Sequence, residues 1–310
     1  MKILVTCPPM LGLQDEFVPA MKSQGYEVHC PTVTQTLSER ELVELVPQFD
    51  GWIIGDDPAT RTVFEAGRSG RLRAAVKWGI GVDNVDFDAC AALGIPITNT
   101  PGMFGAEVAD LAIGYLIALA REIFPIDRGV RGGGWPKNRG ISLAGRTVGV
   151  VGFGDIGQCT ASRAVAHGLS VIAWDPAKKD VNDKNVTLKA WPDGVEQCDF
   201  LVLTCALNAH NRHMVNSEVL ARAKAGLRFV NVARGPLVQE GALIDALRCG
   251  QVHSAALDVF EEEPLPIGSY LREHPLCILG SHNASNTVDA VRRTNTLAIE
   301  KLLSFLGEPD

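Results

Sequence analysis

Three residues of complementary chemistry each follow an apolar segment in the second half of the chain. Arg234 comes after FVNVA, Glu263 after ALDVFEE and His282 after CILGS. Singly, each has an ordinary structural interpretation: a surface arginine, one member of an acidic run, and a loop histidine. Together they form a set, because the carboxyl ends of parallel strands face the ligand crevice of an open α/β sheet. Since a guanidinium binds carboxylates and polarises carbonyls while an imidazole exchanges protons, the set predicts acid–base chemistry on a hydroxyacid or ketoacid.

A strand, a glycine loop and a helix stand in the middle of the chain. Thr147–Val151 is a β-branched run typical of a strand buried on both faces. Gly152, Gly154 and Gly157 follow at once in G-x-G-x-x-G spacing. The first glycine permits a tight turn, the second lets the backbone approach a pyrophosphate, and the third lets helix and strand pack closely. The placement between strand and helix indicates a dinucleotide site, whereas the bare triplet would be weak evidence.

The residues around and after the glycines specify the dinucleotide further. A helix over 158–167 continues from the loop, so the N–H groups of Asp155 and Ile156 would face the phosphates. A second strand, 171–174, ends on Asp175, eighteen residues past Gly157. A carboxylate there can accept hydrogen bonds from the adenosine ribose and would repel a 2′-phosphate. The predicted cofactor is therefore NAD rather than NADP, and no ligand spacing predicts a metal site.

The composition indicates a large globular chain and argues against several other classes. With 310 residues, 46% of them hydrophobic, the chain can bury a large core and form two domains. A net charge of −7 argues against nucleic acid as a partner, because phosphate binding needs a basic face. No apolar run reaches transmembrane length and the start MKILVTCPP lacks a signal-peptide profile, so we expect no membrane partner. Eight cysteines without metal spacing are typical of buried thiols in a reducing cytoplasm.

Strand and helix signals alternate along the first 98 residues and again after residue 146. Repeated βα units with short connections imply parallel sheets covered by helices on both faces. The predicted fold class is therefore α/β, with two Rossmann-like, doubly wound domains. Ser38–Val46 carries a capping box with Glu41, and a helical stretch from Phe104, which Pro125 would kink, can carry the chain between the domains. We expect strands at 3–6, 26–30, 51–54, 73–77, 95–98, 147–151, 171–174, 200–205, 228–232, 255–259 and 277–279, and a closing helix at 288–306.

Several motifs in the right order resemble the D-2-hydroxyacid dehydrogenase family, especially its phosphoglycerate dehydrogenase-like members. They are GIGVDNVD, NTPGMFGAEVADLAIG, TVGVVGFGDIGQ, NVARGPLVQEGAL, ALDVFEEEPLP and GSHNAS. The resemblance covers nearly the whole chain and is far more specific than the glycine triplet. It implies an NAD-dependent oxidoreductase that transfers hydride between nicotinamide and C2 of a D-2-hydroxyacid. In such an enzyme Arg234 would bind the substrate carboxylate and carbonyl, His282 would be the acid/base, and Glu263 would be its partner.

The resemblance also implies positions for substrate, cofactor and domains. Backbone at Ile80 and Gly81, in a glycine-bearing loop able to cradle an anion, would hold the substrate carboxylate. Val232, Ala233 and Asp258 would line the nicotinamide. A substrate domain (1–98 and 287–310) and an NAD-binding domain (99–286) would form a cleft for the reaction. Two copies would pair through the cofactor domain into a homodimer.

Departures from the family pattern leave the substrate open. Phosphoglycerate enzymes tend to carry a basic residue where this chain has Gly55, which Asp56 and Asp57 follow. Lys77 and Lys137 are the remaining candidates for phosphate ligands. Phosphoglycerate and hydroxypyruvate-like acids are thus both open, as are the pathway and the direction of the reaction.

Two other activities remain as alternatives on the same residues. Corepressors that resemble this family retain its catalytic residues, so one alternative is a non-enzymatic, NAD-sensing binding protein. Formate dehydrogenase-like chemistry is a weaker alternative, because that branch carries an amide where this chain has Glu263. Turnover of any 2-ketoacid would separate an enzyme from a sensor.

Overall fold

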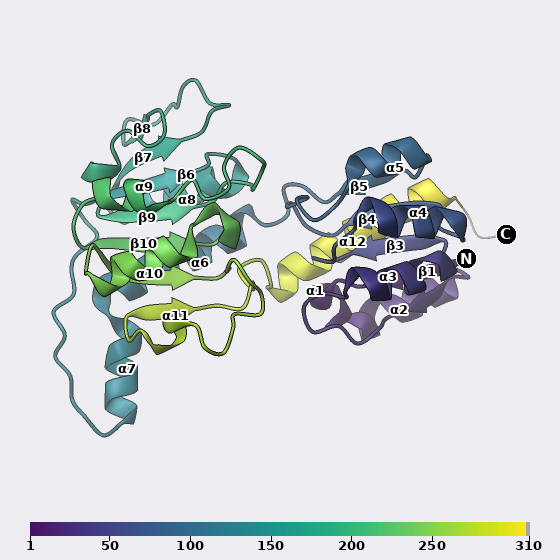
Figure 1. The fold of residues 1–310 in the computed structure, drawn as a ribbon, viewed down its shortest axis with the longest axis horizontal. Coiled ribbons are helices and arrows are strands. Elements are labelled where there is room, and N and C mark those ends of the chain that lie inside the picture. The colour runs from purple at the N-terminus through teal and green to yellow at the C-terminus, as the bar shows by residue number, and fades with distance from the viewer. Residues whose placement is uncertain (308–310) are drawn as a thin grey trace. The chain divides into compact units, whose positions relative to one another are not determined.

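The computed structural model describes residues 1–307 and divides the chain into two compact units (Figure 1). The first is Met1–Phe104 together with the chain from Ser285 onward, and the second is Gly105–Ala284. The first division, after Phe104, lies six residues after the expected domain boundary, and the second, after Ala284, lies two residues before the expected one. The last three residues of the expected segment 287–310 lie outside the described residues. The expected α/β class with two parallel sheets is confirmed.

A five-stranded parallel sheet forms the centre of the first unit. Its strands run in the order β2-β1-β3-β4-β5, so the direction of winding reverses between β1 and β3. The carboxyl ends beside such a reversal are where open α/β sheets bind ligands. The strands are β1 (Lys2–Val5), β2 (Glu27–His29), β3 (Gly51–Ile54), β4 (Ala74–Lys77) and β5 (Ile97–Asn99).

Helices cover both faces of this sheet. Trp52 packs in a core beneath α3 (Glu39–Leu45), α4 (Arg61–Ser69) and α5 (Phe87–Leu93). Its neighbour Gly51 faces the other side, where a Cβ would lie 2.9 Å from Leu306 of α12 (Val288–Leu306). The closing helix therefore belongs to the first unit. The other helices of this unit are α1 (Pro8–Leu11), which contacts α12, and α2 (Gln14–Ser23), which contacts β2.

A seven-stranded parallel sheet forms the centre of the second unit. Its order is β12-β11-β10-β9-β6-β7-β8, so the winding reverses between β6 and β9. The ends of β6 and β9 therefore border the expected ligand crevice. The strands are β6 (Thr147–Val151), β7 (Ser170–Trp174), β8 (Val186–Leu188), β9 (Phe200–Leu203), β10 (Leu227–Asn231), β11 (Val252–Leu257) and β12 (Cys277–Leu279).

Helices also cover both faces of the larger sheet. α6 (Gly105–Arg121) and α8 (Asp155–Ala166) pack together. Because the winding reverses at β6, right-handed connections are expected to put α9 (Ser217–Arg222) and α10 (Glu240–Arg248) on the opposite face. The two helices share one core with strands β9, β10 and β11. α11 (Tyr270–Glu273) precedes β12. α7 (Ile123–Arg131) extends away from the sheet, as Figure 1 shows, and none of its residues is buried.

The structure confirms most expected elements and corrects two points. The capping box of Ser38 and Glu41 is present, and β3, β6, β12 and α12 have the expected bounds. The long helical stretch, however, breaks at Glu122, whose φ is +53, rather than at Pro125. Pro125 is the third residue of α7, where a missing N–H removes no helical hydrogen bond. The three-residue edge strand β8 was not expected, because its sequence is too short to show a period.

Candidate active site and cofactor site

The glycine loop joins the carboxyl end of β6 to α8. Gly152 has φ +89, and a Cβ there would lie 2.6 Å from the backbone of Cys205. A Cβ on Gly157 would lie 2.0 Å from the carbonyl oxygen of Gly152, so packing within the chain requires glycine at both positions. Gly154 differs, because a Cβ there would meet no described atom within 4 Å. The missing side chain at Gly154 therefore serves no internal packing and suits the close approach of a phosphate.

The start of α8 and the end of β7 complete this loop. Gly154 is the N-cap and no side chain caps the helix, so the first-turn N–H groups, those of Asp155 and Ile156 included, lie at its positive end. Asp175 accepts hydrogen bonds from the N–H groups of Phe153 at 2.7 Å and Ala177 at 2.8 Å. An ionised carboxylate has about four acceptor positions. Asp175 can therefore hold the loop and still accept from hydroxyl groups.

An imidazole–carboxylate pair lies at the ends of β11 and β12. Nδ1 of His282 lies 2.8 Å from Oε2 of Glu263, and each side chain is 22% exposed. Oε1 of Glu263 accepts a hydrogen bond from the N–H of Phe260 at 2.9 Å. The N–H of His282 donates to the carbonyl of Asp258 at 2.7 Å and its φ is +55, a value uncommon outside glycine. The pair is thus fixed by backbone on both sides.

Asp258 lies directly after β11 with only one of its oxygens satisfied. The residue is 1% exposed, and Oδ2 accepts from the N–H of Ala284 at 2.8 Å. Oδ1 is buried and has no hydrogen-bond partner within residues 1–307. Burial raises the pKa of this carboxyl group. Oδ1 lies against Gly280, where a Cβ would be 2.1 Å from it, so the chain itself encloses this acceptor and the missing hydrogen bond is a cost within the second unit.

Arg234 follows β10. Asn231 and Gly235, which the sequence did not single out as site residues, fix the loop that carries it. Nδ2 of Asn231 donates to the carbonyl of Arg234 at 2.9 Å, and its Oδ1 accepts from the N–H of Ala233 at 3.0 Å. A Cβ on Gly235 would lie 1.8 Å from the carbonyl oxygen of Phe260. Glycine therefore lets the Arg234 loop lie against the loop that carries Glu263. The available signal was an asparagine shortly before the arginine, since asparagine often bonds nearby backbone in turns.

In the first unit, Ile80 and Gly81 lie in the loop after β4. Thr100 and Asn99, at the end of the neighbouring strand, hold this loop. Oγ1 of Thr100 accepts from the N–H of Gly79 at 2.7 Å, and Nδ2 of Asn99 donates to the carbonyl of Ile80 at 3.1 Å. The loop backbone is thus fixed at the carboxyl edge of the sheet.

The structure places Lys77 inside the first unit rather than at a surface suited to a phosphate. The residue is 2% exposed. Its Nζ donates to the carbonyl of Gly55 at 2.6 Å and lies 3.0 Å from Oδ1 of Asp56. Lys137, the other candidate, lies in an exposed loop with its Nζ 5.3 Å from the ring centroid of Trp135.

Comparison with known families decides what kind of protein carries these loops. Residues 113–284 match the NAD-binding domain of the D-isomer specific 2-hydroxyacid dehydrogenases. The match covers more than half of the chain and includes the glycine loop, Arg234, Glu263 and His282. The chain belongs to this family. It is an NAD-dependent oxidoreductase of 2-hydroxyacids, and the expected resemblance is confirmed.

Individual relatives of the dehydrogenase are similar over most of its length. A hydroxypyruvate reductase of Thermotoga maritima is 35% identical over 88% of this chain and 90% of its own length. A D-3-phosphoglycerate dehydrogenase of Methanocaldococcus jannaschii is 33% identical over 98% of this chain, which spans 57% of that relative. The crystal structure of a glyoxylate reductase from Paecilomyes thermophila matches with a TM-score of 0.84 at 26% identity, over 99% of this chain and 96% of that one.

The residues present fit NAD. Gly154 leaves backbone N–H groups accessible at the start of α8, and the carboxylate of Asp175 lies where a 2′-phosphate would be repelled. These two features belong to neighbouring strand ends of one sheet, those of β6 and β7.

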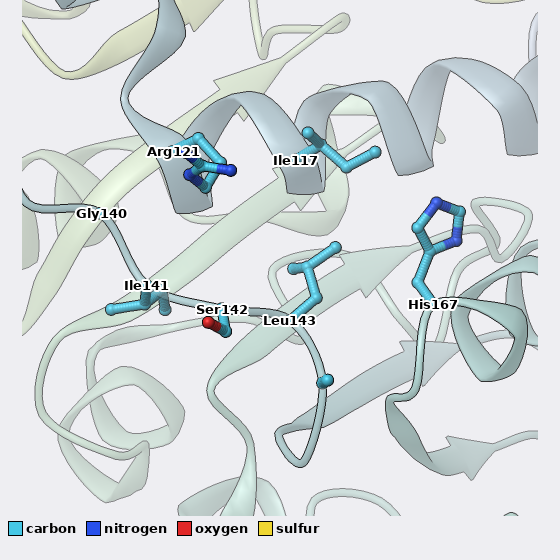
Figure 2. A pocket seen from close by; sticks show the side chains of 8 residues that line it. Ile117, Arg121, Gly140, Ile141, Ser142, Leu143 and His167 are labelled. Atoms are coloured by element: carbon cyan, nitrogen blue, oxygen red, sulfur yellow. The ribbon is translucent and has the colours of Figure 1, made fainter.

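A hollow of about 670 Å³ lies elsewhere in the same unit. Figure 2 shows Ile117 and Arg121 of α6, the loop 140–144 and His167 around it. His167 follows the last residue of α8, whereas the glycine loop precedes the first. Since the helix has 12 residues, its ends are about 18 Å apart. The hollow is therefore at the amino edge of β6, away from the strand ends that carry Arg234 and His282.

Other kinds of site are not found in the part of the chain that the structure describes. Within residues 1–307, no group of three or more His, Cys, Asp or Glu side chains could hold a metal ion. All eight cysteines are unpaired there. None of the described helices combines the length and apolarity needed to cross a membrane.

Proposed function

We propose that the dehydrogenase interconverts a D-2-hydroxyacid and its 2-ketoacid, with Arg234, Glu263 and His282 as catalytic residues. The observation that carries this proposal is the 2.8 Å contact between Nδ1 of His282 and Oε2 of Glu263. These residues follow β12 and β11, and Arg234 follows the next strand, β10. NAD, when bound, supplies or accepts the hydride.

His282 moves the proton in this scheme. Because Glu263 engages Nδ1, the proton is exchanged with substrate at Nε2. In reduction, the imidazolium gives its proton to the ketone oxygen while hydride reaches C2. In oxidation, the neutral imidazole takes the hydroxyl proton while hydride leaves C2. The carboxylate of Glu263 favours the imidazolium and therefore supports reduction at neutral pH.

Arg234 binds the substrate oxygens. Its guanidinium donates to the carboxylate and to the carbonyl oxygen, which polarises C2 for hydride. The backbone of Ile80 and Gly81 contributes donors to the same carboxylate. Lys77 holds the neighbouring loop, the one after β3, through the carbonyl of Gly55 and the carboxylate of Asp56.

The cofactor residues divide by the part of NAD that they contact. The glycine loop and the start of α8 hold the pyrophosphate, Asp175 binds the adenosine ribose, and three residues after β10 and β11 line the nicotinamide. In full they are Gly152, Gly154, Asp155, Ile156 and Gly157; Asp175; and Val232, Ala233 and Asp258. Residues 99–286 thus serve NAD, and residues 1–98 with 287–310 serve the substrate.

The substrate we propose is a small 2-ketoacid of the hydroxypyruvate or glyoxylate kind. Relatives named for both activities support it, as do the burial of Lys77 and the acidic side chain of Asp56 beside it. A phosphorylated acid such as phosphohydroxypyruvate is the second candidate, favoured by the phosphoglycerate dehydrogenase relative.

A reductase screen with NADH tests the proposal. Glyoxylate, hydroxypyruvate, pyruvate and phosphohydroxypyruvate are compared at equal concentration, with His282→Ala as the control. Turnover of a 2-ketoacid by the wild type alone supports the assignment. Tight NADH binding with no turnover on any of them would instead favour the NAD-sensing binding protein.

We further propose a homodimer through the cofactor domain and a cytoplasmic location. Ile123, Phe124 and Val130 of α7 are 43–46% exposed, and Trp135 is 75% exposed. Apolar side chains gathered on one exposed segment mark an interaction surface. Sedimentation of the wild type against Phe124→Glu measures whether this surface holds two copies together. The unpaired cysteines are consistent with a reducing compartment.

A further inference from the structure

A second histidine–glutamate pair lies beside the proposed catalytic one. Nε2 of His213, in the loop after β9, is hydrogen-bonded to Oε1 of Glu261, in the loop after β11. His213 has φ +54, almost the value found at His282. A non-glycine residue persists in this left-handed region where surrounding contacts fix it. The pair is therefore a defined contact between two loops.

Glu261 also holds a third loop. Its Oε2 accepts a hydrogen bond from the N–H of Glu240, the first residue of α10, at 3.2 Å. Its own N–H donates in return to Oε2 of Glu240 at 3.3 Å. A carboxylate at this position also complements the positive end of α10. One side chain thus joins the loops after β9, β10 and β11.

These three loops carry residues to which the proposed function assigns chemistry. Glu240 follows Arg234 by six residues, and Glu261 precedes Glu263 by two. The N–H of His213 donates to the carbonyl of Pro236 at 2.8 Å, so the loop after β9 also holds the Arg234 loop directly. The charged groups that face one another here are His213, Glu240, Glu261 and, on the same loop, Glu262.

We infer that His213 and Glu261 form a clamp that positions Arg234 and Glu263 without touching the substrate. The inference rests on the proposed function, because it concerns how those residues are held. Loss of the clamp lets the loop after β11 move, so that Glu263 engages His282 less firmly. A displacement of about 1 Å at a catalytic group can cost orders of magnitude in rate.

The chain offers a matched pair of variants, Glu261→Gln and Glu262→Gln. Glu262 has the same side chain on the same loop, yet no hydrogen-bond or ion-pair partner within residues 1–307. We expect Glu261→Gln to lower kcat/KM about tenfold and to move the alkaline fall of ketone reduction to lower pH, because the imidazolium of His282 loses support. Glu262→Gln should keep wild-type kinetics and the wild-type pH profile.

Two variants at His213 provide a rescue. His213→Ala removes the donor, whereas His213→Gln restores an N–H near Oε1 of Glu261. Both carry a Cβ, so the backbone cost at φ +54 is the same in each. We expect His213→Ala to lose as much activity as Glu261→Gln. His213→Gln should recover most of that loss. The double variant His213→Ala/Glu261→Gln should lose little beyond either single change, since one interaction is removed twice.

Hydrogen exchange gives a readout that does not depend on turnover. We expect faster amide exchange over 236–241 and 259–263 in Glu261→Gln than in Glu262→Gln, at an unchanged Tm. Equal exchange, equal pH profiles and equal kcat/KM in the two glutamine variants would overturn the clamp. If His282→Ala retains turnover, the proposed function fails; if it is inactive while the two variants still agree, only the clamp is wrong.

Discussion

At the carboxyl edges of the two sheets, buried charged residues differ in whether all their polar atoms have hydrogen-bond partners inside the chain. In the first unit, Lys77 is bound by Gly55 and Asp56, and the buried Asp57 accepts hydrogen bonds from Leu37 and Gly55. In the second unit, Oδ1 of the buried Asp258 has no partner within residues 1–307. The glycine at position 154 likewise serves no contact inside the chain.

The difference separates buried charged groups that are paired within the fold from one that keeps an oxygen without a partner among the described residues. Breaking a buried ion pair that is satisfied internally is destabilising, because the remaining charge is left without a partner. A buried acceptor without a donor costs stability. Active sites commonly accept such a cost. The four changes below compare the two edges.

The largest effect is expected at Arg234. Arg234→Ala should cost about 3 kcal/mol or more in transition-state binding, because a charged hydrogen bond to the substrate is lost. The measurement is kcat/KM for the best 2-ketoacid, with NADH affinity and Tm nearly unchanged. A variant that keeps wild-type kcat/KM would remove Arg234 from the site.

Lys77 tests whether the first edge is structural. Lys77→Met should lower the free energy of unfolding by about 2 kcal/mol, since Asp56 and Gly55 lose a buried donor. Lys22→Met, an exposed lysine of the same unit, is the control for denaturant unfolding. The opposite pattern, a raised KM at unchanged stability, would make Lys77 a direct substrate ligand.

Asp175 tests cofactor choice at the second edge. Asp175→Ala should narrow the preference for NADH over NADPH about tenfold, or about 1.4 kcal/mol, because the carboxylate no longer repels a 2′-phosphate. Kd values for both cofactors, measured by nucleotide fluorescence, report the change. Asp180→Ala should leave the preference as it is, and wild type that uses both cofactors equally would contradict the assignment.

The smallest effect concerns the stability cost at Asp258. Burial raises its pKa, so its contribution to stability is present below the ordinary value and is lost as pH rises through the native value. Asp258→Asn removes that loss, so it should raise the free energy of unfolding by about 1 kcal/mol near pH 7 and leave it unchanged near pH 4. NADH affinity should fall. Equal stability differences at the two pH values would show that the charge carries no cost.

The sequence predicted those features that depend on local pattern. The strand–glycine–helix unit needed only spacing, and Gly152 and Gly157 prove to be required by contacts closer than 3 Å. Arg234, Glu263 and His282 were predicted to follow strands, and the structure places them after three neighbouring ones. Their chemical roles stay predictions.

Other features depend on residues far apart in sequence. His213 and Glu261 are 48 positions apart in the sequence. His213 lies in a loop without a motif and Glu261 in an acidic run, so no sequence pattern pairs them. Lys77 looked like an available cation, because burial at a strand end depends on neighbouring strands rather than on spacing. The helix breaks at Glu122, whose backbone is left-handed. Neither a proline nor a glycine stands at this position to indicate the break.

The pH dependence of ketone reduction in Glu263→Gln tests the central claim most directly. The substitution keeps the shape of the side chain and removes the charge that favours the His282 imidazolium. Because reduction needs that imidazolium, the rate of the variant should begin to fall at lower pH than in wild type, while activity at acidic pH survives better. An alkaline limb that stays in place would show that Glu263 and His282, although 2.8 Å apart, do not act as one acid–base pair.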